Sequence, residues 1–210
     1  MMSPDETLSK GERTRQAILD AAYILFLNQG YSATSMRQIA KKAGIALGGI
    51  YNHFASKDEI FQALVIVKHP YVQIFPILHD VPGDTAEEFL TNAARIIEVE
   101  MLQRPDFMKL MFIELIEFSG RHFTKLIEII LPLAMSLLQR FVDPTGGVRP
   151  LPPLLIMRTF LGNIIAFYVT GMLMRDPSLP AEMREVHLID FVDIYLHGIL
   201  QSQKTESNNI

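Results

Sequence analysis

Residues 35–57, SMRQIAKKAGIALGGIYNHFASK, constrain the fold more than any other part of the chain. Ser35 precedes a short apolar-periodic segment, and Gln38 follows three residues later, which is the spacing of an N-terminal capping box. Gly44 closes that segment, where a glycine can adopt a left-handed backbone without steric cost. A second short helix is then expected at about residues 46–53. Two short helices around a tight turn predict a helix-turn-helix.

A longer pattern surrounds these two helices. The run AGIALGGIYNHFASKDEIF contains a spaced set of residues, namely Ala43, Gly44, Gly48, Tyr51, His53, Phe54, Ser56 and Lys57. This set resembles the signature of TetR-type bacterial transcriptional regulators, and the similarity extends upstream to cover about residues 13–65. Ala46 departs from the signature, because the family usually has a hydroxyl there. The resemblance implies a DNA-binding domain followed by a helical ligand-binding and dimerisation domain.

The rest of the chain shows helical periodicity and no alternating strand pattern. We therefore expect an all-α, TetR-like fold of about nine helices. A three-helix DNA-binding domain is expected at residues 1–56, and a helical ligand-binding and dimerisation domain at residues 57–210. Irregular structure is expected at residues 70–83, which contain three prolines. Asp84 and Glu87 then predict the capping box of the next helix.

The net charge of −4 is unevenly divided along the chain. Seven basic residues against Glu12 and Asp20 give residues 10–57 a charge of +5, which leaves −9 for the remainder. A basic segment attached to an acidic remainder is typical of a DNA-binding protein. The alternative is a basic surface that is only exposed to solvent, because runs of charge are common on protein surfaces. The chain has no cysteine and no secretory signal, so a cytoplasmic protein is expected.

The DNA contacts are expected from nine residues: Ser35, Arg37, Leu47, Gly48, Gly49, Tyr51, Asn52, His53 and Lys57. Arg37 can bind a guanine edge with two hydrogen bonds, and Tyr51 or Asn52 are further candidates for base contact. His53 and Lys57 are expected on phosphates, where they would position the protein without reading sequence.

The middle of the chain supplies many aromatic and methionine side chains with a few polar groups among them. The candidate ligand-pocket residues are Phe107, Met111, Phe112, Glu114, Phe118, His122, Phe160, Asn163 and Phe167. A mostly apolar pocket with a few placed polar groups suits an apolar or amphipathic small molecule. Ordinary core packing is the alternative for the same residues. The family resemblance also implies a ligand cavity in this region.

Two long final helices are expected at residues 154–174 and 180–201. Their proposed dimer-interface residues are Gly162, Ala166, Thr170, Ile189, Val192, Leu196 and Ile199. Small residues four apart allow another helix to approach closely, and the family resemblance implies dimerisation through these helices. Packing inside one subunit is the alternative. A membrane span at residues 154–174 is disfavoured by Arg158, because a central cation is costly in lipid.

These patterns predict a homodimeric transcriptional regulator, most simply a repressor released from a palindromic double-stranded DNA operator by a small-molecule effector. A regulator without an inducer is the first alternative. An enzyme using Glu114 and His122 as an acid and base is the second. No cofactor or metal is expected, since Asp190, Asp193 and His197 suit a surface ion pair as well as a metal site.

Overall fold

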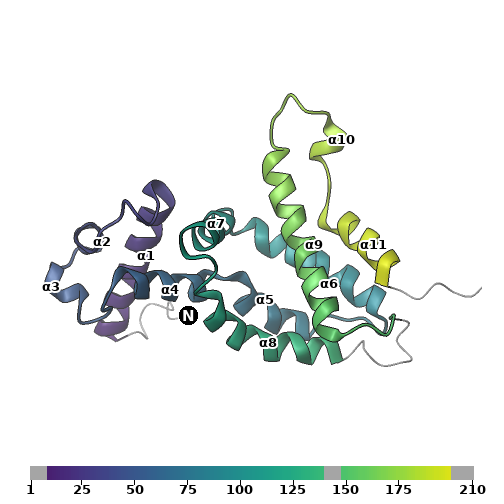
Figure 1. Cartoon of the computed structure of the whole chain (residues 1–210), viewed down its shortest axis with the longest axis horizontal. Helices are drawn as coiled ribbons and strands as arrows, with labels where there is room; N and C mark the ends of the chain where they lie inside the picture. The colour runs from purple at the N-terminus through teal and green to yellow at the C-terminus, as the bar shows by residue number, and fades with distance from the viewer. Residues whose placement is uncertain (1–8, 140–147, 200–210) are drawn as a thin grey trace, which may run out of the picture. The chain divides into compact units, whose positions relative to one another are not determined.

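The computed structural model describes residues 9–139 and 148–199 (Figure 1). In these residues the chain is all-α, as expected. The eleven helices are α1 (Lys10–Gln29), α2 (Met36–Lys42), α3 (Leu47–Ile50), α4 (Lys57–Lys68), α5 (Pro70–His79), α6 (Ala86–Leu102), α7 (Phe107–Phe118), α8 (Phe123–Gln139), α9 (Pro153–Leu173), α10 (Ala181–Arg184) and α11 (Leu188–Ile199). They form two compact units, the first containing residues up to 72 and 105–129, and the second the remainder.

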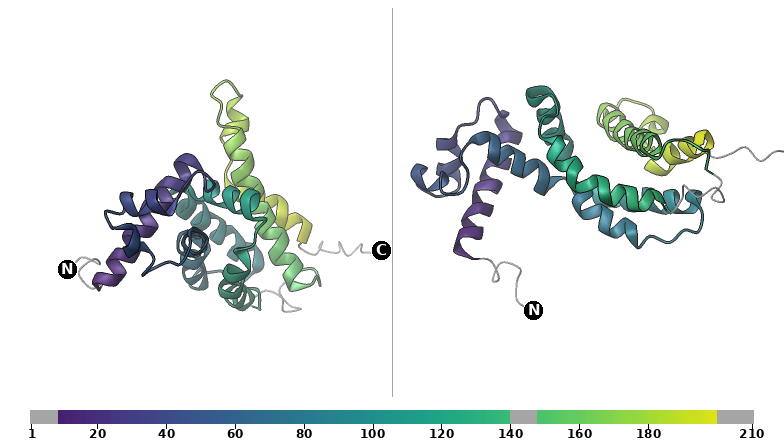
Figure 2. Two further views of the ribbon diagram at one scale, coloured as in Figure 1. Left: turned by 60° about the vertical axis from the view of Figure 1, so that its left-hand side comes forward. Right: turned by 60° about the horizontal axis from the view of Figure 1, so that its bottom comes forward.

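The first unit is built around α1, which packs against α2, α4 and α7. α3 packs against α2, and the same arrangement can be followed in the views of Figure 2. Phe26, Phe54 and Phe61 are its largest fully buried side chains. Since α4 and α7 pack with α1, the unit extends beyond residue 56. The division of functions at residue 57 stays a prediction.

The second unit is held together by α11, which packs against α6 and α9. In Figures 1 and 2, the C-terminal half of α9 and the loop to α10 project away from α6 and α11. α9 is the only helix among the described residues that is long and apolar enough to cross a membrane, and only 11% of its most apolar window is buried. This length and composition alone are weak support for a span, because a helix covered by another subunit has the same properties.

The expectation of irregular structure at residues 70–83 is wrong for Pro70–His79, which form α5. α4 ends at Lys68 because His69, directly before a proline, has an extended backbone with ψ 121°. Pro70 then opens α5, in the first turn of a helix where its missing N–H removes no intrahelical bond. Ile74 and Leu78 bury one face of α5.

Two other boundaries differ from the sequence predictions. The cap of α6 is Thr85, whose hydroxyl accepts a hydrogen bond from the N–H of Glu88, one residue later than the expected Asp84 and Glu87 pair. The expected final helix is divided into α10 and α11. Its break is stabilised by a side chain from α6, because Glu98 accepts a hydrogen bond from the N–H of Leu188 at 3.2 Å.

His69 forms a buried junction between α4 and α5. Its side chain is almost fully buried, and its Nδ1 accepts a hydrogen bond from the N–H of Tyr71 at 3.3 Å. The ring also packs edge-on against Phe107, with 4.9 Å between ring centroids. Burial lowers the pKa of His69 to about 3. The imidazole therefore stays neutral in the folded protein at neutral pH.

We expect this junction to make the protein acid-sensitive. The unfolded chain binds a proton at His69 below its ordinary pKa of 6.5, whereas the folded protein accepts one only near 3, so the free energy of unfolding falls as pH falls through this interval. His69→Gln retains an acceptor but does not titrate. It should remove up to about 1.4 kcal/mol per pH unit of this dependence, measured by urea denaturation at several pH values. The exposed His79→Gln serves as control, and equal slopes for both variants would contradict the assignment.

Candidate nucleic-acid interface

α2 begins and ends where its sequence signals predicted. The N–H of Gln38 donates to the Ser35 hydroxyl at 3.3 Å, and the Gln38 side chain accepts from the N–H of Ser35 at 2.8 Å. At the other end Gly44 has φ +72°. The N–H groups of Gly44 and Ile45 donate to the carbonyls of Lys41 and Ala40. This is the Schellman pattern, so the capping box and the glycine turn are both confirmed.

α3 is shorter than the expected helix at residues 46–53, because α-helical structure ends at Ile50. Three features shorten it: Ala46 makes no side-chain cap, and Gly48 and Gly49 both have low helix propensity. The chain continues as a turn, in which the N–H of His53 donates to the carbonyl of Ile50 at 3.0 Å. The second helix of the motif is therefore one helical turn followed by a tighter turn.

The outer side of α3 is open to solvent. Leu47 is 37% exposed and Tyr51 is 53% exposed, and Asn52 is also exposed. A Cβ atom added to Gly48 or Gly49 would meet no atom within 4 Å. The backbone at these two glycines can therefore approach another molecule without obstruction.

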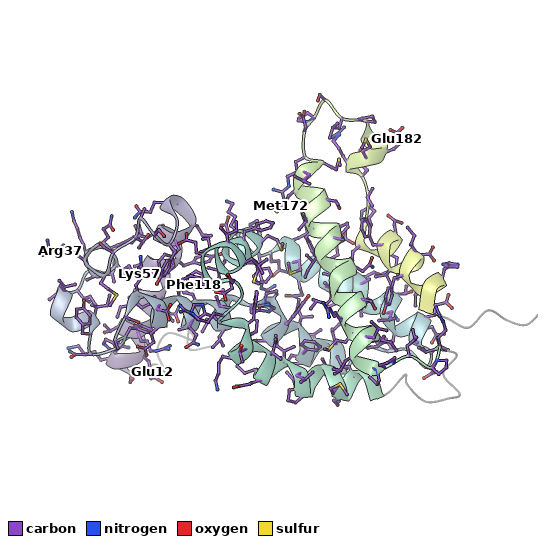
Figure 3. All side chains as sticks on the ribbon, in the orientation of Figure 1. Glu12, Arg37, Lys57, Phe118, Met172 and Glu182 are labelled. Atoms are coloured by element: carbon purple, nitrogen blue, oxygen red, sulfur yellow. The ribbon has the colours of Figure 1, made fainter. Side chains whose placement is uncertain are left out.

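The helix-turn-helix and the start of α1 carry exposed cationic side chains. Arg37 is exposed and makes no hydrogen bond or ion pair with the described residues, and its side chain points away from the ribbon (Figure 3). The other exposed cations of the segment are Lys10, Arg13, Arg15, Lys41 and Lys42. Arg15 lies over the Phe54 ring, at 4.8 Å from its centre. The charges of Arg37, Lys41 and Lys42 on α2 are available to neutralise phosphates.

Two predicted contact residues have partners inside the protein. The Ser35 hydroxyl is occupied by the cap of α2. The ammonium group of Lys57 donates to the carbonyls of Tyr31 and Thr34, at 2.7 and 2.6 Å. These two hydrogen bonds use two of the three hydrogens of the ammonium group, and the phosphate contact of Lys57 stays a prediction. His53 is half-buried at the edge of the same surface.

The predicted pocket residues are divided between the two units. Six of them lie in the first unit: Phe107, Met111, Phe112, Glu114, Phe118 and His122. The other three, Phe160, Asn163 and Phe167, lie on α9 in the second unit, and the Asn163 side chain donates to the carbonyl of Phe191. Whether the nine residues serve one ligand stays a prediction.

Glu114 and His122 are buried and bound to each other. The carboxylate of Glu114 accepts a hydrogen bond from the N–H of His122 at 2.7 Å, and its second oxygen lies 2.7 Å from His122 Nδ1. His122 Nε2 makes no hydrogen bond and lies 3.4 Å from an Asp58 oxygen. Arg121 also pairs with Asp58. These contacts connect the end of α7 to the first turn of α4, so the pair holds the first unit together.

An aromatic cluster surrounds this polar connection. The Phe118 ring stacks on Phe61 with 4.7 Å between centroids and meets the edge of Tyr31 at 4.5 Å. Phe118, which was predicted as a pocket residue, is half-buried in this cluster. Its partners from α1, the following loop and α4 were not singled out from the sequence, because helical periodicity does not show which helices meet.

The predicted dimer residues fall into two groups. Gly162, Ala166 and Thr170 are exposed on α9. On α11, Ile189 is half-buried, whereas Val192 and Leu196 are only 0% and 3% exposed within a single chain. The prediction that Val192 and Leu196 face a partner is therefore wrong, because α6 and α9 of the same chain already cover their side of α11. The side chain of Ile199 lies outside the described residues.

The alternative metal site receives no support from the described part of the chain, where no group of three His, Cys, Asp or Glu side chains is placed to hold an ion. Asp190 instead accepts a hydrogen bond from the N–H of His187. His197 Nδ1 lies 2.7 Å from the backbone oxygen of Asp193. Both side chains thus have local backbone partners.

Known proteins resemble the chain most clearly over this surface. Residues 18–64 match the family model described as bacterial regulatory proteins, tetR family. The transcriptional regulator SrpR of Pseudomonas putida is 44% identical over 66 residues, which are 31% of this chain and 31% of SrpR. AcrR of Shigella flexneri is 46% identical over 59 residues, 28% of this chain and 27% of AcrR. The chain therefore matches about a third of the length of these relatives.

Solved structures resemble the chain over almost its whole length. NalD of Pseudomonas aeruginosa has a TM-score of 0.68 at 24% identity, covering 92% of this chain and 100% of NalD. SmeT of Stenotrophomonas maltophilia has a TM-score of 0.66 at 23% identity, covering 95% of this chain and 94% of SmeT. These likenesses show that the fold is shared. Residues 18–64, which include most of the capped helix-turn-helix, therefore match the model of the tetR family of bacterial regulatory proteins, and the rest of the chain shares the fold of these solved structures.

Proposed function

We propose that this protein is a sequence-specific DNA-binding transcriptional repressor. The observation that carries the proposal is the exposed surface of α2 and α3, where unpartnered cations flank an open backbone. SrpR and AcrR, which match this segment, are both named as helix-turn-helix transcriptional regulators. A protein that binds DNA in bacteria works in the cytoplasm, which is where we place this one.

In the proposed complex α3 enters a major groove and α2 crosses the DNA backbone. Leu47, Tyr51 and Asn52 face the bases, and Gly48 and Gly49 allow the backbone close to them. Arg37 reaches a guanine edge, where its planar guanidinium can donate two hydrogen bonds. Lys41 and Lys42, at the end of α2, neutralise phosphates.

Selection of fragments from the source organism's genomic DNA by the purified protein tests this function. We expect recovery of a palindromic site, protected in footprinting, with binding that weakens steeply as salt increases. Its neighbouring genes would identify what is regulated. Weak binding that does not focus on any fragment would refute sequence-specific regulation.

Arg37 and Lys42 should respond differently to substitution. Arg37→Ala should cost about 1–3 kcal/mol of binding free energy and relax preference at particular base positions, because a base contact is lost. Lys42→Ala should weaken binding to all sequences equally and reduce the salt dependence, because a phosphate contact is lost. Binding to a panel of single-base operator variants distinguishes the two. If both variants lose the same binding free energy on every operator variant, Arg37 does not contact a base.

We also propose a homodimer formed through the exposed side of α9. One short reading helix contacts few base pairs, whereas two related by a twofold axis address a palindrome. The exposed apolar residues on this side include Ile165 and Leu173, at 46% and 69%, and Ile194 of α11 is 74% exposed. A second copy would bury this surface, and the small side chains of Gly162 and Ala166 would let the helices approach closely. Such a partner also accounts for the apolar composition of α9 without a membrane.

Ala166→Glu should give a monomer, because a carboxylate at the centre of this surface would be buried without a partner. Sedimentation velocity measures the change, and operator affinity should fall with it. Ser178→Glu, in the exposed loop after α9, should remain dimeric. A dimeric Ala166→Glu protein would place the interface elsewhere.

We further propose that an apolar or amphipathic small molecule releases the repressor from DNA. NalD and SmeT are described as repressors of multidrug efflux pumps, and this chain shares their fold. A ligand acts by favouring a conformation that binds the operator poorly, and a differential affinity of a few kcal/mol is sufficient. Release of labelled operator by a panel of apolar compounds tests this step. A dimer that ignores every compound would favour a regulator without an inducer.

A further inference from the structure

We propose that Lys57 is a positioning residue, which fixes the start of α2, the first helix of the helix-turn-helix, and does not bind phosphate. The proposal rests on the proposed DNA-binding function. It concerns the loop at residues 30–35, which connects α1 to α2, and the first residue of α4.

The ammonium group of Lys57 is committed to this loop. Its Nζ atom donates to the carbonyls of Tyr31 and Thr34 at 2.7 and 2.6 Å, which uses two of its three hydrogens. The same atom lies 4.0 Å from the centre of the Tyr31 ring, in a cation–π contact. Partial burial lowers the pKa of Lys57, while the nearby Glu117 carboxylate opposes that shift.

The two carbonyls belong to the two ends of the loop. Tyr31 follows Gly30, the C-cap of α1, and Thr34 directly precedes Ser35, the N-cap of α2. Thr34 is buried, and its hydroxyl donates to the carbonyl of Gly30 at 2.8 Å. By holding both carbonyls, Lys57 ties the end of α1 and the start of α2 to α4. The orientation of α2 determines where Arg37 and the phosphate-binding lysines lie.

Helix electrostatics favours this location of the charge. α1 has no basic residue in its last turn, and Tyr31 directly follows its C-cap Gly30, close to the negative end of the helix. Lys57 supplies the missing cation from another helix. The same residue opens α4, where a positive charge is unfavourable, and Asp58 and Glu59 in the first turn of α4 offset it. Lys57 is thus better placed for α1 than for its own helix.

The salt dependence of operator binding separates a positioning residue from a phosphate ligand. Lys57→Met keeps an unbranched side chain only one atom shorter but removes all its donors. We expect operator affinity to fall by about tenfold or more, with the slope of log K against log salt unchanged. Lys42→Met is the matched control, and it should reduce the magnitude of that slope by about 0.9.

Each other outcome overturns the proposal. A reduced slope for Lys57→Met would identify Lys57 as a phosphate ligand. Unchanged operator affinity in a folded but less stable variant would leave it only a structural role. If the wild-type protein itself binds no specific DNA, the proposed function fails instead, and the two failures are distinguishable.

If the Lys57→Met variant does not fold, a measurement on the wild-type protein still tests the proposal. Reductive methylation with formaldehyde, followed by mass spectrometry of each lysine, reports which amines are free. Lys57 should react slowly with or without operator, whereas Lys41 and Lys42 should react quickly and become protected by DNA. Fast reaction of Lys57 that operator suppresses would overturn the proposal.

Discussion

A helix of four residues cannot maintain its own shape in water, and the DNA-reading surface depends on this constraint. Isolated helices below about 12 residues are marginal even in favourable sequences, and α3 contains two glycines. α3 is held in place by buried side chains at its C-terminal end and in the turn that follows. Ile50 and Phe54 are 0% and 1% exposed, so they anchor the element at its C-terminal end. The reading surface is therefore only as well ordered as the core of α1, α2 and α4 beneath it.

That core is itself tied to α7 by polar groups as well as by apolar packing. A buried carboxylate such as that of Glu114 is tolerated only when it is paired and hydrogen-bonded, and His122 provides both contacts. Asp58 of α4 adds an ion pair with Arg121, which is next to His122 in the chain. In addition, the Ser32 hydroxyl donates to Glu117 at 2.7 Å, which links the loop after α1 to the end of α7. The loop that sets the start of α2 is therefore in direct contact with the end of α7.

Local signals were predicted well and long-range ones poorly. The capping box at Ser35 and the glycine turn at Gly44 depend only on neighbouring residues, so the sequence was sufficient to place them. The break before α11 depends on Glu98, which lies about ninety residues away, and no local pattern indicates it. The stripe containing Val192 correctly predicted an apolar contact. It did not reveal whether that contact is made within the same chain or with a second copy. Periodicity identifies the apolar side of a helix but not the element that packs against it.

The same distinction applies to the candidate site. Exposed candidate contact residues such as Arg37 could be chosen from the sequence because surface position follows from helix phase. The role of Lys57 could not, because both of its carbonyl partners lie more than twenty residues earlier in the chain. Glu114 and His122 were chosen from the sequence because a carboxylate and an imidazole can serve as an acid and base pair. Its burial among aromatic rings, which decides its role, emerged only from the packing of helices.

The empty space above Gly48 and Gly49 also affects how this protein can evolve. A Cβ atom added at either position would lie in open space, and replacing a helical glycine removes a residue of low helix propensity. New groups can therefore be placed on the DNA-facing surface by single mutations that leave the core intact. Operator preference in such a chain can diverge after gene duplication without first requiring a compensating gain in stability.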